Sequence, residues 1–260
     1  TIYIKDLTSG EILPERINNT GAGAAWANGS RTFFYVQKEP GTLRYYKIFR
    51  HSLGTDESED VEIYHEADET FSTYVYRSKS DQYIMIASYQ TLSSEYRILN
   101  ADDPEGEFRI FSPRQRDHEY SIEHFGDKFY IVTNWEAQNF RLMETPVVNT
   151  NQENWKEVIA HRPDVMLSGV EVFTSYRVVS ERKSGLRQLR IINQNSGDEH
   201  YLDFGEEAYV AYVSTNPEFD TEVLRYGYQS MTTTNSTYDY NMMTKEKTLL
   251  KQQEVVGDFD

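Results

Sequence analysis

Apolar and polar residues alternate with a period of two along most of the chain. Short segments place β-branched and aromatic residues between small or polar residues, as in "TFFYVQK", "QYIMIASYQ", "KFYIVTN", "YRVVSER" and "VLRYGYQS". This alternation is typical of half-buried strands, whereas an amphipathic helix would repeat about every 3.6 residues. The pattern predicts an all-β chain.

The predicted strands recur as a strand, a Gly-containing or polar turn, and a second strand. Landmark turns fall at Gly10, Gly54, Gly106, Gly197 and Lys245, which lie 44, 52, 91 and 48 residues apart. The spacing of 91 is close to two units, so a further polar turn is expected near residue 152, within "VVNTNQENWKEVI". A four-stranded unit recurring at roughly 40–50 residues is the sequence sign of a β-propeller.

We therefore expect one β-propeller over residues 1–260, built from four-stranded antiparallel blades. Residues 1–20 are expected to supply only the outer two strands of an earlier blade. About five complete blades follow, with expected starts near Ala24, Phe71, Glu119, Val165 and Tyr209. A chain that begins in mid-blade presents an unpaired edge, so pairing of two copies edge to edge is a further expectation.

The charge balance bears on possible partners. Lys and Arg total 26 against 42 Asp and Glu, a formal net charge of −16. Such a field opposes binding to nucleic acid and attracts cationic ligands. No apolar run approaches the roughly 18 residues of a membrane span, so no membrane association is expected.

Cysteine is absent from the 260 residues. This fits a reducing cytoplasm and excludes thiolate metal ligands and cysteine nucleophiles. The first residues, "TIYIKDLTSGE", show neither a basic region followed by an apolar core nor an initiating Met. We expect a cytoplasmic protein of which this chain is a part.

Catalytic motifs are not found in the sequence. It has no G-x-S-x-G, no H-E-x-x-H and no Gly-rich loop with phosphate-binding spacing, so we assign no catalytic, cofactor or metal-binding residue. The densest polar cluster is "RQRDHEYSIEH", which contains Arg114, Arg116, Asp117, His118, Glu119 and His124. Neighbouring residues of a strand point to opposite faces, which disfavours a metal site. A channel or interdomain contact and a solvated turn remain open.

Two long segments closely resemble the propeller of oligopeptidase B (protease II), a branch of the prolyl oligopeptidase family of serine peptidases. They are "RQRDHEYSIEHFGDKFYIVTN" and "NPEFDTEVLRYGYQSMTTTNSTYDYNMMTKEKTLLKQQEVVGDFD". The shorter "LRYYKIFRHSLGT" is similar to the same branch, and the order of the blades follows it.

The resemblance implies a seven-bladed propeller that caps an α/β-hydrolase domain carrying a Ser-Asp-His triad. Such enzymes cut short peptides after Lys or Arg. The hydrolase domain would follow Asp260, further blades would precede Thr1, and this chain would be a truncated propeller without the triad. It would contribute gating, by admitting only thin, flexible peptides. The candidate interdomain or channel residues are Arg44, Arg50, Arg114, Arg116, His118, Glu119 and Arg225.

Two alternatives remain. A stand-alone propeller scaffold that binds a protein partner would have closed ends. A glycan-active propeller enzyme would need two carboxylates facing one another across a glycosidic bond, and no such pair stands out in this acidic sequence.

Overall fold

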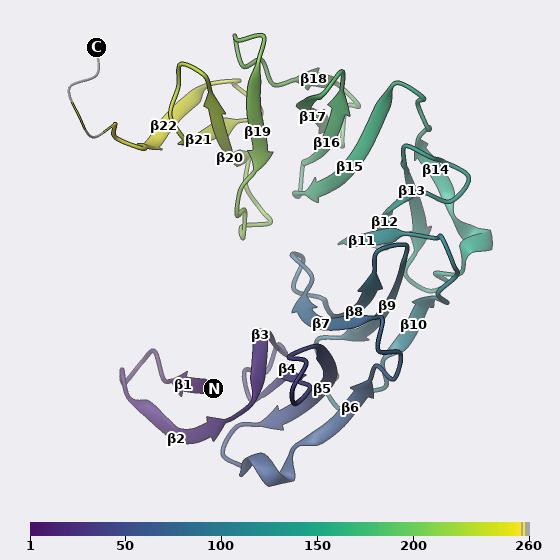
Figure 1. Cartoon of the computed structure of the whole chain (residues 1–260), viewed down its shortest axis with the longest axis vertical. Helices are drawn as coiled ribbons and strands as arrows, with labels where there is room; N and C mark the ends of the chain where they lie inside the picture. The colour runs from purple at the N-terminus through teal and green to yellow at the C-terminus, as the bar shows by residue number, and fades with distance from the viewer. Residues whose placement is uncertain (256, 258–260) are drawn as a thin grey trace. The chain divides into compact units, whose positions relative to one another are not determined.

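The computed structural model describes residues 1–255 and residue 257. Contacts divide the chain into two units, Thr1–Glu119 and Tyr120–Asp260. Most of the segment "GDFD", where the chain was expected to lead into a hydrolase domain, lies outside the described residues. Each unit is described by itself below (Figure 1).

The first unit contains three antiparallel sheets. A two-stranded sheet pairs β1 (Ile2–Lys5) with β2 (Ile12–Ile17). A four-stranded sheet has the order β3 (Thr20–Trp26), β4 (Thr32–Lys38), β5 (Tyr45–Ser52), β6 (Val61–His65). The next has the order β7 (Ser72–Arg77), β8 (Tyr83–Gln90), β9 (Ser93–Asn100), β10 (Arg109–Ser112). A single-turn 3₁₀ helix, η1 (Glu57–Glu59), precedes β6.

The second unit repeats this four-stranded arrangement three times. Its sheets are β11 (Tyr120–Phe125), β12 (Lys128–Thr133), β13 (Arg141–Pro146), β14 (Lys156–Ile159); β15 (Val165–Val172), β16 (Tyr176–Lys183), β17 (Leu186–Asn193), β18 (Glu199–Tyr201); and β19 (Tyr209–Val213), β20 (Val223–Ser230), β21 (Ser236–Asn241), β22 (Lys247–Gln252). The 3₁₀ helix η2 (Gln152–Asn154) precedes β14. Five four-stranded sheets and one two-stranded sheet confirm the predicted all-β fold of antiparallel blades.

The six landmark turns all occupy the same place in the fold. Each joins the last two strands of its sheet, including the turn at η2 near residue 152 and the turn at Gly10 between β1 and β2. Three of them share one structure, in which an Asp or Asn side chain accepts from the backbone N–H groups two and three residues later. The side chains are those of Asp6, Asn193 and Asn241.

Each of these three turns closes in the left-handed region, at Gly10 (φ 77°), Gly197 (φ 77°) and Lys245 (φ 66°). Glycine adopts that conformation without a steric penalty, whereas Lys245 does so as a non-glycine residue. The two-stranded sheet β1–β2 therefore shares its turn with the last two strands of two of the four-stranded sheets.

Burial falls from the second strand of each sheet to the fourth. In β4 and β8 the central four or five residues are all buried, whereas every residue of β22 is exposed. Neighbouring sheets cover both faces of β4, with Phe34 and Val36 in one cluster and Phe33 and Tyr35 in another. Such a second strand is a continuous apolar run, which departs from the period-two alternation expected for these segments. The hydrophobic core therefore follows the inner strands of every sheet.

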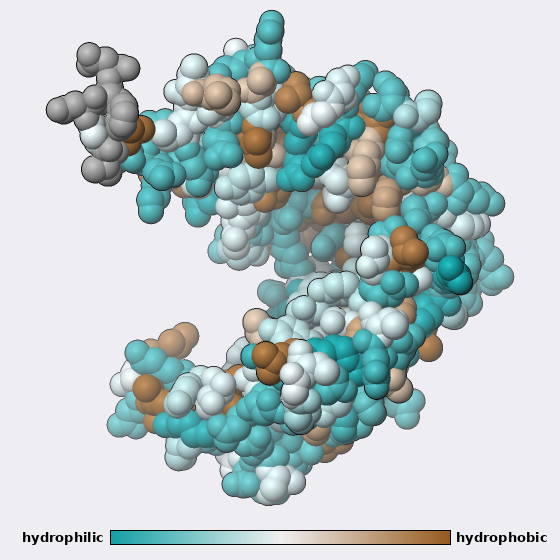
Figure 2. Space-filling model, in the orientation of Figure 1, coloured by the Kyte–Doolittle hydropathy of each residue, from teal (hydrophilic) through white to brown (hydrophobic). Residues whose placement is uncertain are grey.

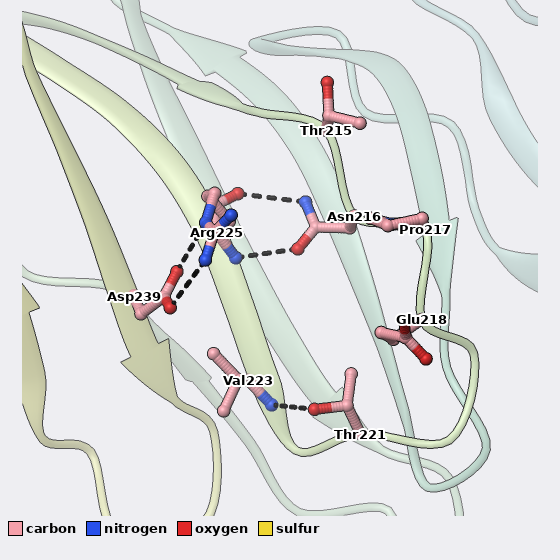
Figure 3. Close-up of a pocket in the computed structure, with 8 residues that line it drawn as sticks. All are labelled: Thr215, Asn216, Pro217, Glu218, Thr221, Val223, Arg225 and Asp239. Atoms are coloured by element: carbon pink, nitrogen blue, oxygen red, sulfur yellow. Dashed lines mark hydrogen bonds and ion pairs between the residues drawn. The ribbon is translucent and has the colours of Figure 1, made fainter. Parts of the chain in front are cut away.

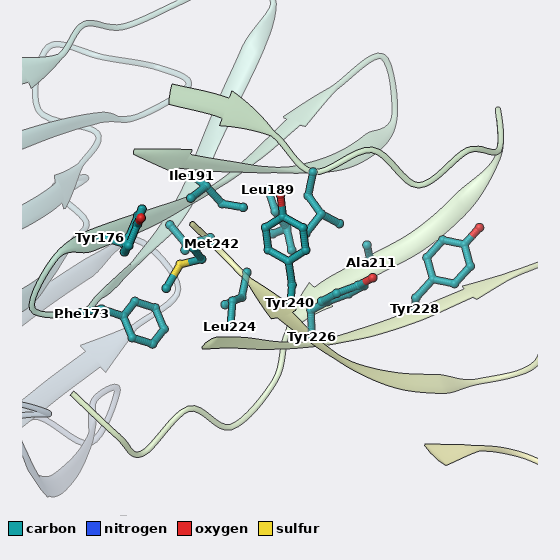
Figure 4. Packing of buried hydrophobic residues seen from close by; sticks show 12 residues of the cluster. Phe173, Tyr176, Leu189, Ile191, Ala211, Leu224, Tyr226, Tyr228, Tyr240 and Met242 are labelled. Atoms are coloured by element: carbon teal, nitrogen blue, oxygen red, sulfur yellow. The ribbon is translucent and has the colours of Figure 1, made fainter. Parts of the chain in front are cut away.

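The core between the last two sheets of the second unit is largely aromatic (Figure 4). Tyr226 and Tyr240 of one sheet pack with Leu189 and Ile191 of the other. Tyr226 also stacks on Tyr238, with ring centroids 5.4 Å apart. Large rings bury much area per residue, so a short strand can hold a neighbouring sheet.

Hydrophilic residues cover most of the face drawn in Figure 2, and hydrophobic residues are scattered over it. No helix in the described part of the chain is long and apolar enough to cross a membrane.

Candidate functional site

Arg114, in the link between β10 and β11, inserts its side chain between two buried carboxylates. Its Nη2 lies 2.7 Å from Glu66 Oε2 and 3.3 Å from Glu95 Oε1. The side chains of Glu66 and Glu95 are only 4% and 6% exposed. Glu66 follows β6 and Glu95 lies in β9, so one guanidinium group joins two neighbouring sheets of the first unit.

Tyr64 and Arg97 complete this group of side chains. The Tyr64 hydroxyl donates to Glu66 Oε2 at 2.6 Å, and Arg97 Nη1 lies 2.5 Å from Glu95 Oε1. The Arg97 guanidinium also sits 4.2 Å above the centroid of the Tyr64 ring. We call Tyr64, Glu66, Glu95, Arg97 and Arg114 the Arg114 cluster. Two guanidinium groups balance two carboxylates, as buried charges require.

Arg44 also contacts the segment between β6 and β7 that contains Glu66. Its Nη1 donates to the backbone carbonyls of Glu66, Asp68 and Phe71 at 3.2, 3.1 and 2.9 Å. The Arg114 guanidinium lies 4.1 Å above the Phe71 ring. Arg44 therefore binds the backbone of residues 66–71, while Arg114 contacts the side chains of Glu66 and Phe71 in the same segment.

The hydrogen bonds of the Arg114 cluster shift the pKa values of Glu66 and Arg114 so that both groups stay charged. Burial by itself would raise the pKa of Glu66, but hydrogen bonds from Arg114, Tyr64 and the Asp68 backbone outweigh it and lower that pKa. Burial would likewise lower the pKa of Arg114, but its bonds to Glu66 and Glu95 raise it. Groups held so firmly in their charged forms are poor proton donors and acceptors near neutrality. The arrangement suits a contact between sheets, not acid–base catalysis.

The other candidates of the first unit are placed separately. Arg50 donates to the Pro104 carbonyl at 3.0 Å and pairs with Glu105 at 2.6 Å, so it too links the two four-stranded sheets. Arg116 is 89% exposed and lies 3.6 Å from Asp117. His118 is buried, and its burial lowers its pKa. Glu119 is half-buried.

The polar segment around His118 therefore does not converge on one point. Within the residues that the structure describes, no three His, Asp or Glu side chains are placed to hold a metal ion. Arg44, Arg50 and Arg114 all contribute to the boundary between the same two sheets, whereas Arg116 points to solvent.

Arg225 lines a pocket of about 380 Å³ in the second unit (Figure 3). Its Nε and Nη2 donate two hydrogen bonds to the carboxylate of Asp239, at 2.8 and 2.9 Å. Asn216 accepts from the Arg225 backbone N–H at 2.7 Å and donates to its carbonyl at 2.9 Å. Asp239 neutralises the guanidinium, so Glu218 gives this polar pocket an acidic balance.

Sequence reasoning missed the buried carboxylates Glu66 and Glu95. In a chain with 42 Asp and Glu, nothing local distinguishes a buried carboxylate from a solvated one. The available signal was Arg114 itself, already a candidate residue, because a half-buried guanidinium of this kind needs an acidic partner.

Comparison with known proteins shows which family the chain belongs to. Residues 1–253 match the model of the N-terminal β-propeller domain of prolyl oligopeptidase. The chain is 42% identical to dipeptidyl aminopeptidase BI of Pseudoxanthomonas mexicana, over 99% of its own length and 35% of the relative's. It is 28% identical to protease 2 of Moraxella lacunata, over 100% of the chain and 37% of that relative.

Solved structures agree with the sequence matches. Oligopeptidase B from Leishmania major superimposes with a TM-score of 0.90 at 25% identity, covering 98% of this chain and 37% of that one. The closed form of oligopeptidase B from Trypanosoma brucei, with covalently bound antipain, gives 0.88 at 27% identity, covering 95% and 36%. The chain thus spans about a third of the length of these relatives.

Proposed function

The chain belongs to the prolyl oligopeptidase family, and from this premise we propose that it is the access-controlling propeller of a serine oligopeptidase. The catalytic triad would lie in an α/β-hydrolase domain elsewhere in the same protein, and the whole enzyme would cleave short peptides after Lys or Arg. The observation that carries the proposal is the match of residues 1–253 to the propeller domain of a peptidase family. The chain spans about a third of the length of its relatives, which leaves room for a catalytic domain in the whole protein.

The Arg114 cluster supports a role in access. Charged side chains hold the boundary between the sheets β3–β6 and β7–β10 from three positions, through Arg44, Arg50 and Arg114. Separating these sheets would break these ion pairs and expose the apolar residues packed between the sheets, such as Phe34 and Ile84, to water, which opposes opening of the boundary. A peptide would therefore not enter through this boundary, and access would be limited to other routes.

The charge of the chain supports a cationic substrate. Its formal net charge of −16 attracts basic peptides over distances of about one Debye length, ~8 Å at physiological salt. We place the enzyme in the cytoplasm, because the 260 residues contain no cysteine.

A second candidate activity is the release of dipeptides from a free N-terminus. The observation that favours it is the 42% identity to a protein named dipeptidyl aminopeptidase BI. Substrates of that kind would carry an α-ammonium group, which suits an acidic protein equally well.

Two substrate series separate these activities in the protein expressed from the intact reading frame. The first consists of N-blocked peptides with Arg or Lys before a chromogenic group, and the second of dipeptides with free amino groups before the same reporter. Proline-containing analogues serve as controls. Cleavage of the blocked basic peptides supports the first activity, and cleavage of only unblocked dipeptides supports the second. Inactivity toward both series would contradict a peptidase.

Access control has its own test in the intact protein. The Arg114→Met enzyme should cleave peptides that are too long for the wild-type enzyme to accept. Its rate of hydrolysis of a tripeptide reporter should stay within about twofold of the wild-type rate. Arg116→Met is the matched control, because Arg116 is an exposed arginine of the same link. If both variants cleave long peptides at the wild-type rate, this boundary does not control access.

Edge-to-edge pairing of two copies of the chain remains a prediction. Light scattering of the 260-residue chain should show a dimer, and a monomer at all concentrations would exclude it.

A further inference from the structure

A cavity of about 490 Å³ lies in the first unit, where β2 faces the turn between β5 and β6. Its walls are formed by Pro14, Glu15, Arg16, His51, Gly54, Thr55, Asp56 and Glu57. This volume is in the usual range for small-molecule sites. The cavity shares no residue with the Arg114 cluster or with the Arg225 pocket.

Hydrogen bonds hold the two walls together. The Gly54 N–H donates to Glu15 Oε1 at 2.9 Å. Asn18 donates from its backbone N–H and its Nδ2 to the two carboxylate oxygens of Glu57, both at 3.2 Å. Beneath them, Ile4 and Ile17 pack with Phe33 and Tyr35. The cavity is therefore a defined part of the fold.

His51 is fully buried at the edge of this cavity, and its orientation is fixed. Its Nδ1 lies 2.7 Å from Asp60 Oδ1, while Asp60 Oδ2 accepts from the Tyr35 hydroxyl at 2.8 Å. The Asp60 side chain is only 2% exposed. Because this carboxylate accepts at both oxygens, the proton of a neutral His51 ring belongs on Nδ1. The lone pair then lies on Nε2, on the opposite edge of the ring.

Two buried acceptor atoms are left over at the cavity. His51 Nε2 and Glu15 Oε2 are both shielded from solvent, and neither has a hydrogen-bond partner in the part of the chain that the structure describes. A buried polar atom without a partner is unfavourable, so two of them beside one cavity point to a ligand that donates to both.

The charged residues that line the cavity indicate that a ligand with N–H donors should be positively charged. Three carboxylates, from Glu15, Asp56 and Glu57, face one guanidinium, that of Arg16. Arg16 Nη1 is engaged by the backbone carbonyls of Leu13 and Glu15, at 2.5 and 2.6 Å. The walls thus carry an acidic excess and two unused acceptors.

We propose that this cavity binds an organic cation with N–H donors, of the class of a guanidinium or primary ammonium on an alkyl chain, such as a basic side chain of a peptide. The cation would donate one N–H to His51 Nε2 and another to Glu15 Oε2, and its charge would be balanced by the acidic wall. The described residues do not group three His, Asp or Glu side chains as a metal site would need, which favours an organic cation. This proposal rests on the geometry of the first unit and is independent of the proposed peptidase activity.

The test compares n-butylguanidine with n-butylurea, which has the same shape without the charge. With the protein labelled with ¹⁵N-histidine, n-butylguanidine should shift the Nε2 resonance of one of the six histidines saturably, and calorimetry should give a matching affinity. The urea should produce neither signal. Equal binding of the two probes, or no saturable shift from n-butylguanidine, would overturn the proposal.

Two variants locate the site. Glu15→Gln keeps an oxygen acceptor for the Gly54 N–H and removes the charge, so affinity should fall about tenfold or more. Glu11→Gln, at an exposed residue of the turn between β1 and β2, should bind as the wild type does. His51→Asn keeps an N–H close to the place of Nδ1 and removes the Nε2 acceptor. If it remains folded by circular dichroism, binding should be lost; if it unfolds, Glu15→Gln alone decides. Unchanged affinity in Glu15→Gln would refute the site.

Discussion

In the first unit a buried arginine–carboxylate group joins two sheets, whereas in the second unit a similar group stays within one sheet. Glu181 of β16 is 1% exposed and pairs with Arg162, from the link before β15, and with Arg190 of β17 at 3.5 Å. The Tyr201 hydroxyl of β18 donates to its other oxygen at 2.8 Å. We call these four residues the Glu181 cluster.

The two clusters use the same chemistry for different purposes. Each has buried carboxylate oxygens that accept from arginines and from one tyrosine hydroxyl. In the Arg114 cluster, Glu66 and Tyr64 come from the end of one sheet while Glu95 and Arg97 come from the next. The positions of the partners along the chain therefore decide whether a buried ion pair ties blades together or stiffens a single blade.

The largest effect is expected at Arg114. Arg114→Met removes the only group that contacts both Glu66 and Glu95 within this cluster, which leaves Glu66 buried without a cationic partner there. We expect a loss of about 3 kcal/mol in the free energy of unfolding, measured by urea denaturation. Arg116→Met should change it by less than about 0.5 kcal/mol. Equal effects of the two variants would mean that the cluster adds no stability.

Arg162→Met should have a smaller effect, about 1–2 kcal/mol, because Glu181 keeps Arg190 and Tyr201. Hydrogen exchange distinguishes the two clusters further. Exchange should accelerate within β15–β18 alone in Arg162→Met, but in both β3–β6 and β7–β10 in Arg114→Met. Acceleration confined to one sheet in Arg114→Met would contradict its role between sheets.

The contribution of Glu66 should depend on pH. Its pKa in the folded protein is lowered from the ordinary value of 4.5, so its stabilisation is fully present above pH 4.5 and is lost as the pH falls below 4.5 through the lowered pKa. The stability difference between wild type and Glu66→Gln should therefore be greatest near pH 7 and shrink toward pH 3, as followed by urea denaturation at each pH. A difference that stays constant over this range would show that the charge of Glu66 is not involved.

The smallest effect is expected for the Arg225–Asp239 pair, which has good two-point geometry but an arginine side chain that is 46% exposed. Arg225→Met should destabilise the protein less than either Arg114→Met or Arg162→Met does, and 1 M salt should reduce the difference from the wild type. A loss as large as that of Arg114→Met would show that two-point geometry outweighs burial in setting the strength of these pairs.

Much of the fold could be read from local patterns. Short segments of β-branched and aromatic residues predict the strands, although the second strands are buried on both faces and do not alternate. Turn residues such as Gly10, Gly197 and Lys245 predict where the last two strands of a sheet meet. These signals work because strand and turn conformations depend on residues that are close in sequence. The predicted β-propeller class follows from their regular recurrence, and the resemblance to the prolyl oligopeptidase family is confirmed by the match over residues 1–253.

The partners of the candidate residues could not be read in the same way. Arg114 meets Glu66 across 48 residues of sequence, and His51 and Glu15 come to one cavity from different sheets. Among 42 acidic residues, only burial separates Glu66, Glu95 and Glu181 from solvated carboxylates, and burial depends on how neighbouring sheets stack. The sequence by itself determined the strands, their turns and the family; only the tertiary structure decided which charges are buried and paired, because pairing depends on long-range packing.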